Sequence, residues 1–148
     1  MDLIDDSDVM PEPEVLSLPQ QLATLKPVLA SSTFIFATFP PNAPVPPSLP
    51  VQMLFREAEG MTLVTTRNAA DAEGIDYWQV VRLITLEHTK MQSMDFMAFV
   101  TNRLLKDVKI DVNFVSGYHH DYCFVGTGYE EQVMRCLQDI ANEAQEGE

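Results

Sequence analysis

Hydrophobic residues along the chain follow the two spacings that distinguish strands from helices. Residues 33–39 (TFIFATF) are aromatic and β-branched, which predicts a strand buried on both faces. Residues 53–57 and 61–65 are two further strand-like runs joined by EAEG, whose Gly60 can supply the positive φ of a short hairpin turn. We therefore expect these two runs to pair antiparallel.

Helical spacing appears in a segment from about residue 94 to 106, with Ser93 as its N-cap. Met97, Val100 and Leu104 recur at intervals of three and four residues, and Phe96 and Phe99 lie beside them. This pattern predicts a helix whose apolar stripe packs on a sheet.

The C-terminal segment has the same spacing and begins at residues 127–130 (TGYE), a capping-box pattern. Its apolar residues predict one buried face: Val133, Leu137, Ile140 and Ala144. Two shorter helices are expected at residues 17–26, capped by Ser17, and at residues 67–73, ended by Gly74.

The remaining segments complete the expected fold. Residues 40–50 contain enough prolines to prevent regular structure, so they predict a stiff loop. Residues 77–86 (YWQVVRLITL) form a strand long enough to bridge two structural units. Residues 110–114 alternate in polarity and residues 122–125 return after a glycine turn. The order predicts an α+β fold of the ferredoxin-like βαββαβ type, with a mainly antiparallel sheet and helices on one face.

The two halves of the chain have a similar order of elements. We therefore expect a first, degenerate unit at residues 16–76, in which the loop at 40–50 replaces a helix, and a second unit at residues 77–144. The segment 1–15 contains six acidic residues and no lysine or arginine, so it predicts a disordered tail, as do residues 145–148.

The formal net charge of −13 narrows the classes of partner. Between positions 17 and 141, thirteen acidic residues oppose nine basic ones, so this part carries about −4 and the ends carry the rest. An acidic chain without a basic stripe repels phosphate backbones, which argues against nucleic-acid binding. We find no signal peptide and no apolar run of about 20 residues, and therefore expect a soluble cytoplasmic protein with no membrane contact. Cys123 and Cys136 lack metal-ligand spacing and predict reduced, packed thiols.

Three motifs resemble the small ACT-domain proteins built of two ACT-like units. They are VRLITLEHTKMQSMDFMAFVTNRL (81–104), DVNFVSGYHHDYCFVG (111–126) and PVQMLFREAEGMTLV (50–64). The first carries a threonine-leucine strand end and a histidine-serine loop before the helix. The second carries a glycine-tyrosine turn and a histidine-aspartate pair. The likeness extends over about residues 25–141.

This resemblance implies a βαββαβ fold and a role in sensing small molecules, typically amino acids, at the junction between ACT units. The chain is also similar to the ACT repeats of a eukaryotic cytosolic arginine sensor, in which an acidic residue at the head of the equivalent strand helps to hold the ligand. Asp121 matches that residue. Where the family usually has glycine at the start of the helix, this chain has Asp95. A carboxylate there favours a cationic group over an anion, or the loss of ligand binding.

The candidate ligand-binding site therefore lies between loop 88–95 and turn 117–121. Its residues are His88, Thr89, Met94, Asp95, Phe96, Gly117, His120 and Asp121. His88, His119, His120 and Asp121 also have side chains that can bind metals or transfer protons, but adjacent histidines on a strand point to opposite faces. We therefore favour a hydrogen-bonded turn over a metal site, and expect no cofactor. Gly117 is expected to serve the turn, and Arg56 and Arg82 to pair with Glu57, Glu59 or Asp76.

No hydrolase, phosphate-loop or zinc-protease motif is present. Our first hypothesis is a non-enzymatic regulatory module that binds an amino acid or amine. The second is a structural or protein-interaction adaptor that supports a homodimer or another protein partner. A small enzyme that uses His120 with Asp121 is the third. The space at the junction could instead be filled by Trp78, Phe96 or Phe114.

Overall fold

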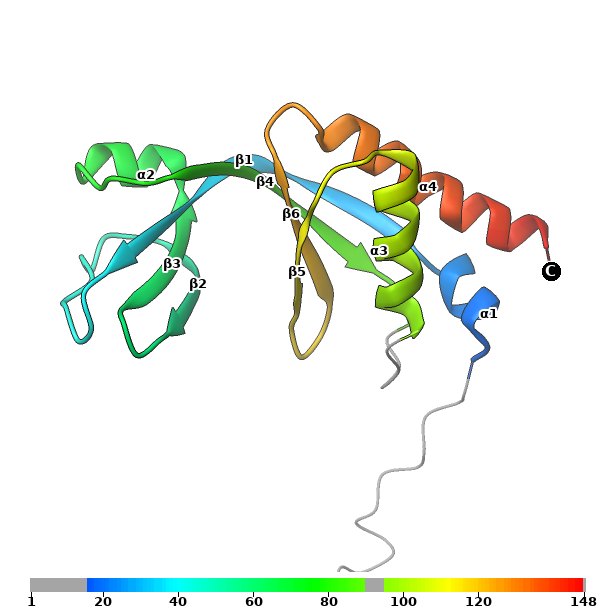
Figure 1. Cartoon of the computed structure of the whole chain (residues 1–148), viewed down its shortest axis with the longest axis horizontal. Coiled ribbons are helices and arrows are strands. Elements are labelled where there is room, and N and C mark those ends of the chain that lie inside the picture. Colours follow the sequence, from blue (N-terminus) through cyan, green and yellow to red (C-terminus); the bar gives the residue numbers. More distant parts are fainter. Residues whose placement is uncertain (1–15, 90–94, 148) are drawn as a thin grey trace, which may run out of the picture.

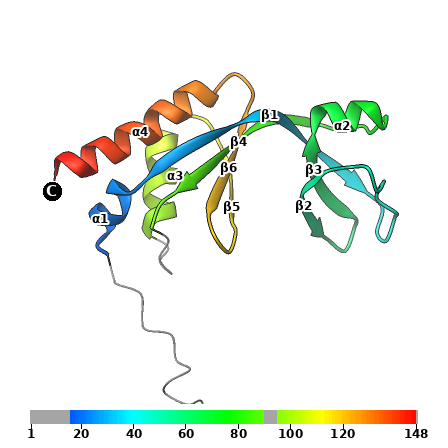
Figure 2. The same ribbon diagram turned by 180° about the vertical axis from the view of Figure 1, so that it is seen from behind.

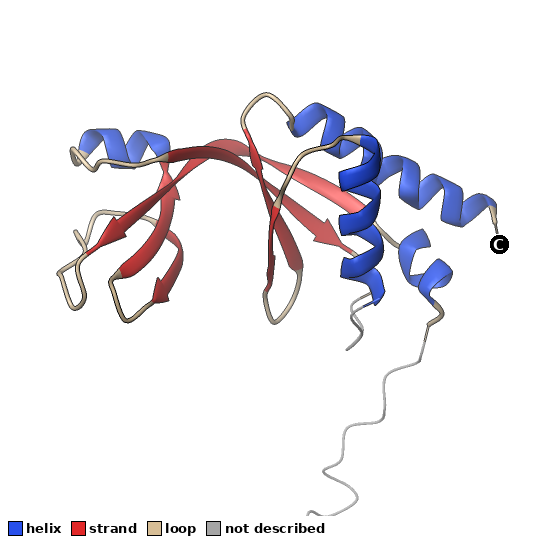
Figure 3. Ribbon diagram, in the orientation of Figure 1, coloured by secondary structure: helices blue, strands red, loops and turns tan. Residues whose placement is uncertain are grey.

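The computed structural model describes residues 16–89 and 95–147. Its strands form one six-stranded antiparallel sheet in the order β2-β3-β1-β4-β6-β5. The sheet bends like an arch, and the helices lie on its outer face (Figures 1 and 3). The expected α+β architecture, with an antiparallel sheet and helices on one face, is confirmed. The predicted tail (1–15), Ser93, Met94 and Glu148 lie outside the described residues.

The elements have the following bounds: α1 Leu18–Ala23, β1 Lys26–Phe39, β2 Val51–Arg56, β3 Met61–Thr66, α2 Arg67–Ala72, β4 Gln79–Glu87, α3 Asp95–Asp107, β5 Asn113–Ser116, β6 Asp121–Gly126 and α4 Glu130–Glu146. The 51–66 hairpin and the short helix before Gly74 were predicted correctly. Gly74 has φ +66°, as a helix C-terminus requires.

Strands β1 and β4 run through the whole molecule and carry both halves of the sheet. β1 pairs with β3 on one side and with β4 along most of its length, and β4 pairs with β6. The predicted 77–86 strand is thus found at the centre of the sheet, between β1 and β6, while its role as a bridge between two units stays a prediction.

β1 is twice as long as predicted, because it begins at Lys26 rather than Thr33. Helix α1 correspondingly ends at Ala23, not at residue 26. The physical reason is Pro27, since the residue before a proline avoids the helical region of the backbone. The predicted cap is confirmed: the Ser17 hydroxyl accepts from the backbone amide of Gln20 in a reciprocal capping box.

One turn prediction and one helix-cap prediction were wrong. Gly60 does not adopt a positive φ. A Cβ there would lie 2.6 Å from the carbonyl oxygen of Phe39, so a close backbone approach explains the glycine. At the start of α4 the N-cap is Tyr129, without a side-chain cap, and the Glu130 carboxylate accepts from the amide of Gly128 at 2.6 Å.

In the second half of the chain, the bounds of β5 and α4 also differ from the predicted ones. β5 contains only residues 113–116, and Ile110 and Val112 precede it as half-buried core residues. α4 continues through Gln145 and Glu146, which we had expected to be disordered. Its last turns lie beside α1, where the Gln145 side-chain amide donates to the Ala23 carbonyl at 3.0 Å (Figure 2).

Among the described residues the core has three clusters: one under α3 and α4, a small one beneath α2 (Ile35, Ala37 and Ala70), and one on the inner face of the sheet. On the outer face, α3 and α4 bury their apolar stripes against β4 and β6, and the buried stripe of α3 is Phe96, Val100 and Leu104 rather than one centred on Met97. On the inner face of the arch, the cluster is formed by strand residues alone: Phe34, Phe36, Val64, Val81, Leu83 and Phe124. The outer-face core positions the candidate site.

Candidate functional site

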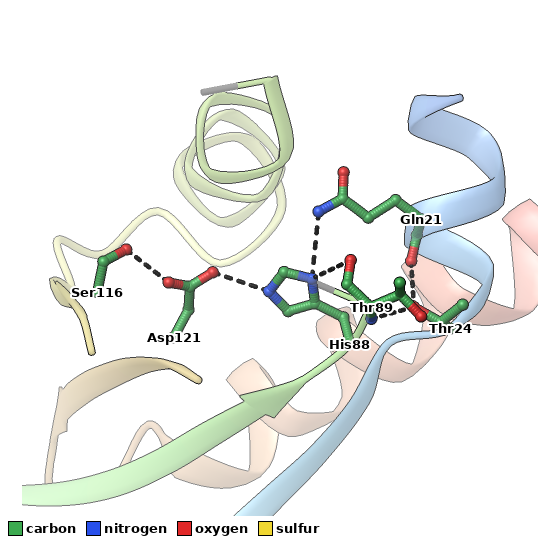
Figure 4. A network of polar contacts seen from close by, with 6 residues as sticks. All are labelled: Gln21, Thr24, His88, Thr89, Ser116 and Asp121. Atoms are coloured by element: carbon green, nitrogen blue, oxygen red, sulfur yellow. Dashed lines mark hydrogen bonds and ion pairs between the residues drawn. The ribbon is translucent and has the colours of Figure 1, made fainter. Parts of the chain in front are cut away.

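The end of β4 and the start of β6 bring two titratable side chains together. Nε2 of His88 lies 2.8 Å from Oδ2 of Asp121, and the side chains are 2% and 4% exposed (Figure 4). Leu86 is the cross-strand partner of Asp121, so His88 lies two residues farther along the same face of the sheet. The pairing therefore follows from strand register.

The other ring nitrogen of His88 faces α1 and the following residue. Nδ1 lies 3.2 Å from Nε2 of Gln21 and 3.3 Å from the carbonyl oxygen of Thr89. In the neutral ring, Nδ1 accepts from the Gln21 amide while Nε2–H donates to Asp121. In the imidazolium, Nδ1–H has the Thr89 carbonyl as its acceptor. Both forms of the ring thus find partners.

Two further contacts fix the ends of this network. The Ser116 hydroxyl of β5 donates to Oδ1 of Asp121 at 2.5 Å. The Thr24 hydroxyl donates to the Gln21 carbonyl at 2.6 Å and accepts from the amide of Thr89 at 2.9 Å. The network thereby connects α1, β4, β5 and β6.

The imidazole of His88 also stacks on Phe96, in the first turn of α3. The ring centroids are 3.7 Å apart and the planes are inclined by 15°. Phe96 is itself 1% exposed. The stack closes the side of the pair that faces α3, so the imidazole and carboxylate are shielded from solvent in this structure.

Four of the predicted site residues come together here: His88, Thr89, Phe96 and Asp121. His120 does not join them: it is exposed in the turn before β6, and its ring is edge-on to that of Tyr122, with the centroids 6.4 Å apart. Gly117 forms the β5–β6 turn, donating to the His120 carbonyl at 2.8 Å. Asp95 is exposed at the start of α3. Met94 lies outside the described residues.

Sequence reasoning missed three members of the network: Gln21, Thr24 and Ser116. Gln21 is 3% exposed. A glutamine on the buried side of a short helix was the available signal, because buried polar side chains need partners. What it could not show is that α1 packs against the end of β4.

The structure also shows the partners of the two strand arginines. Arg82 contacts Glu130 at 3.3 Å and the Ala30 carbonyl at 2.9 Å, so its predicted pairing with a nearby acid was wrong. Arg56 donates to the sulfur of Met61 at 3.7 Å.

Both cysteines are free and buried, and burial raises the pKa of the Cys123 thiol to about 12. Such a thiol is unreactive at neutral pH.

Chemically, the site is a closed, hydrogen-bonded acid–imidazole pair. Within residues 16–89 and 95–147, no group of three or more His, Cys, Asp or Glu side chains is placed to hold a metal ion. The helices in the same ranges include none with the length and apolar character needed to cross a bilayer.

Comparison with known proteins identifies the fold. The family model of the ACT domain matches residues 13–82, nearly half of the chain. No curated protein matches the chain.

Solved structures match over a longer span. A protein of unknown function from Vibrio cholerae, described as a possible transport protein, superposes with a TM-score of 0.74 and 27% identity over 84% of this chain and 95% of that one. A protein from Agrobacterium tumefaciens superposes with a TM-score of 0.63 and 12% identity, over 80% of this chain and 90% of that one. The structure of the aspartokinase α and β subunits superposes with a TM-score of 0.55 and 13% identity, over 80% of this chain and 99% of that one.

These comparisons agree with the architecture. The ACT match ends at Arg82, so the division into two ACT-like units at residues 16–76 and 77–144 stays a prediction. The fold is α+β and ACT-like, and in its first half the chain is similar to the ACT domain.

Proposed function

We propose that this protein is a non-enzymatic regulatory module that binds a small amine or amino acid between loop 88–95 and turn 117–121. ACT domains in general are regulatory domains that bind small ligands, and the ACT model matches the first half of the chain. The observation that carries the proposal is the buried carboxylate of Asp121 at the junction of α3, β4, β5 and β6.

A buried carboxylate selects a cationic or hydrogen-bond-donating partner. In this structure His88 and Ser116 occupy both oxygens of Asp121. An ammonium or guanidinium group offers the same donors as the imidazole, and its positive charge offsets the cost of burying the carboxylate. A ligand therefore reaches Asp121 by displacing the ring of His88.

The start of α3 adds to this preference. Asp95 places a negative charge in the first turn of the helix, next to Phe96, whose ring stacks on His88. An anionic ligand approaching this end of the site meets two carboxylates. A cation is attracted by both, which favours amines over acidic amino acids.

The mechanism is a shift between two arrangements. With His88 inside, α1 is tied to β4 through Gln21 and Thr24. With a ligand in its place, those contacts to α1 are lost, and the position of α1 reports that the ligand is bound. The ligand shifts the balance between the arrangements by as much as its affinities for the two differ.

Thermal denaturation with a panel of amino acids and amines tests the proposal. A ligand at 100 times its dissociation constant stabilises the native state by about 2.7 kcal/mol. We expect arginine, lysine or a simple amine to raise the melting temperature of the wild type but not of Asp121→Asn. Asp139→Asn, an exposed change on α4, is the matched control and should keep the effect. Stabilisation by glutamate alone, retained in Asp121→Asn, would contradict the proposal.

A protein-interaction adaptor is the second candidate, favoured by three exposed apolar side chains. Val51, Phe55 and Trp78 are 46%, 64% and 61% exposed, and β2 is an edge strand of the sheet. If no amine stabilises the protein, and light scattering shows a dimer that Phe55→Ser dissociates, this function replaces the first.

A further inference from the structure

A polar hollow lies on the helix-bearing face of the sheet, away from the His88–Asp121 pair. Its volume is about 750 Å³. Hydroxyl groups of Ser31, Ser32 and Thr33 on β1 line one side, and Arg67, Asn68 and Asp71 on α2 line the other. Volumes of this order are typical of small-molecule sites. The nearest part of β4 is Arg82, six residues or about 20 Å along the strand from His88.

An irregularity in β1 creates the hollow. The β1–β4 register shifts between Leu29 and Thr33, where a bulge turns Ser31 and Ser32 outward. Helices α2 and α4 stand apart above this part of the sheet, and strands β1 and β4 pass between them without a covering helix (Figures 1 and 2). The Pro-rich segment 40–50 forms a loop where a βαββαβ unit would have a helix.

Among the described residues, the guanidinium of Arg67 has contacts at one of its three nitrogens. Its Nε lies 3.2 Å from the Tyr77 hydroxyl and 4.0 Å from Asp71, and the Tyr77 hydroxyl donates to Asp71 at 2.9 Å. Its two terminal nitrogens have no hydrogen-bond partner among residues 16–89 and 95–147. A planar pair of donors in that state matches a carboxylate.

A second unsatisfied donor lies on β4, close to the bulge but outside the residues that line the hollow. Arg82 is the cross-strand partner of Thr33, and its Nε is buried without a hydrogen-bond partner in the described part of the chain. Its terminal nitrogens are held by Glu130 and the Ala30 carbonyl. Buried donors of this kind usually have an acceptor, either an ordered water or a ligand atom. The bulge is thus flanked by two guanidinium groups with donors to spare.

We propose that this hollow binds a small hydroxylated carboxylate. The carboxylate pairs with Arg67, and the ligand hydroxyls exchange hydrogen bonds with the hydroxyls of Ser31 and Ser32 and donate to Asp71. Purely apolar molecules find no matching surface there. The proposal goes beyond the proposed function, because it concerns a separate place on the sheet, beside α2, and a ligand of opposite charge.

NMR titration with D-gluconate tests it directly. Because the site is polar and open to water, we expect a dissociation constant on the order of 1 mM. Backbone amide shifts should concentrate at residues 31–33 and 67–71, and not at residues 116–121. Sorbitol, which has the hydroxyls without the carboxylate, should bind at least about tenfold more weakly, as expected if the charge-assisted pair is lost.

A charge-matched pair of variants makes the test decisive. Arg67→Met removes the guanidinium and should weaken gluconate binding about tenfold or more. Arg135→Met removes an equal charge from an exposed position on α4 and should leave binding unchanged. Both changes are at exposed side chains, and the amide spectrum reports whether the fold is kept. Absence of binding at tens of millimolar, equal weakening in both variants, or shifts centred on residues 116–121 would each overturn the proposal.

Discussion

His88 and Asp121 are 33 residues apart in the sequence, yet Nε2 of the imidazole lies 2.8 Å from Oδ2 of the carboxylate. The pair lies where α1, α3, β4, β5 and β6 meet. Each polar atom of the pair has a partner, and the ring stacks on Phe96. This relationship makes one residue pair responsible for both the local stability and the proposed ligand specificity.

Asp121→Ala should destabilise the protein by about 2–4 kcal/mol, because it leaves the buried His88 ring without its acceptor and removes the partner of the Ser116 hydroxyl. Urea unfolding measures the loss. A double-mutant cycle with His88→Ala should give a coupling energy of about 1–3 kcal/mol. A coupling near zero would mean that the two side chains stabilise the fold independently.

Gly60→Ala tests the close approach at the β2–β3 turn. Its Cβ would meet the Phe39 carbonyl at 2.6 Å, a backbone atom held in β1, so we expect a loss of about 1–3 kcal/mol. Gly126→Ala is the control, because its nearest neighbour is a tyrosine ring atom at 4.0 Å. Equal unfolding midpoints for the two variants would show that the contact is relieved at no cost.

The sequence predicted elements whose causes are local. The hairpin of β2 and β3 follows from two apolar runs around a short polar turn, and α1 from the Ser17 cap. The first half of β1 could not be predicted in this way. Residues 26–32 contain a proline and two serines and read as a connection, but pairing with residues 84–87 of β4 makes Lys26–Leu29 a strand.

The candidate site also combines features that follow from local sequence with features that depend on distant contacts. Strand alternation was applied to His119 and His120, and it left His120 grouped with Asp121, whereas the structure buries Asp121 and leaves His120 exposed in the turn before β6. The contribution of Gln21 depends on how α1 docks against β4, 67 residues away in the sequence, which no local pattern encodes. The mistaken partners of Arg82 have a similar origin: Glu130 is 48 residues away and arrives with α4.

Acid should weaken the start of α4 through Glu130. The pKa of Glu130 is held below its ordinary value by the hydrogen bond from its own backbone amide, with further contributions from the Gly128 amide and Arg82. Because the folded pKa is lower than the unfolded value, this stabilisation is complete above pH 4.5 and is lost as the pH falls through the folded pKa.

Glu130→Gln should therefore lower the stability at pH 7 by about 0.3–1 kcal/mol, the range for a screened charge at a helix N-terminus. The difference from the wild type should shrink as the pH is lowered towards 3. Melting temperatures of the two proteins between pH 3 and pH 7 give the measurement. A difference that stays constant over this range would assign the effect to packing rather than to charge.

Thiol labelling tests the burial of the two cysteines. Burial raises the pKa of Cys123 to about 12, and it also raises the pKa of Cys136 above its ordinary value. At pH 8 the thiolate fraction of Cys123 is therefore far lower than that of an exposed thiol. We expect an aromatic disulfide reagent to label neither cysteine in the native protein and both in urea. Cys123→Ser and Cys136→Ser variants assign any native labelling to one residue, and rapid reaction of Cys123 would show that β6 opens at its centre without global unfolding.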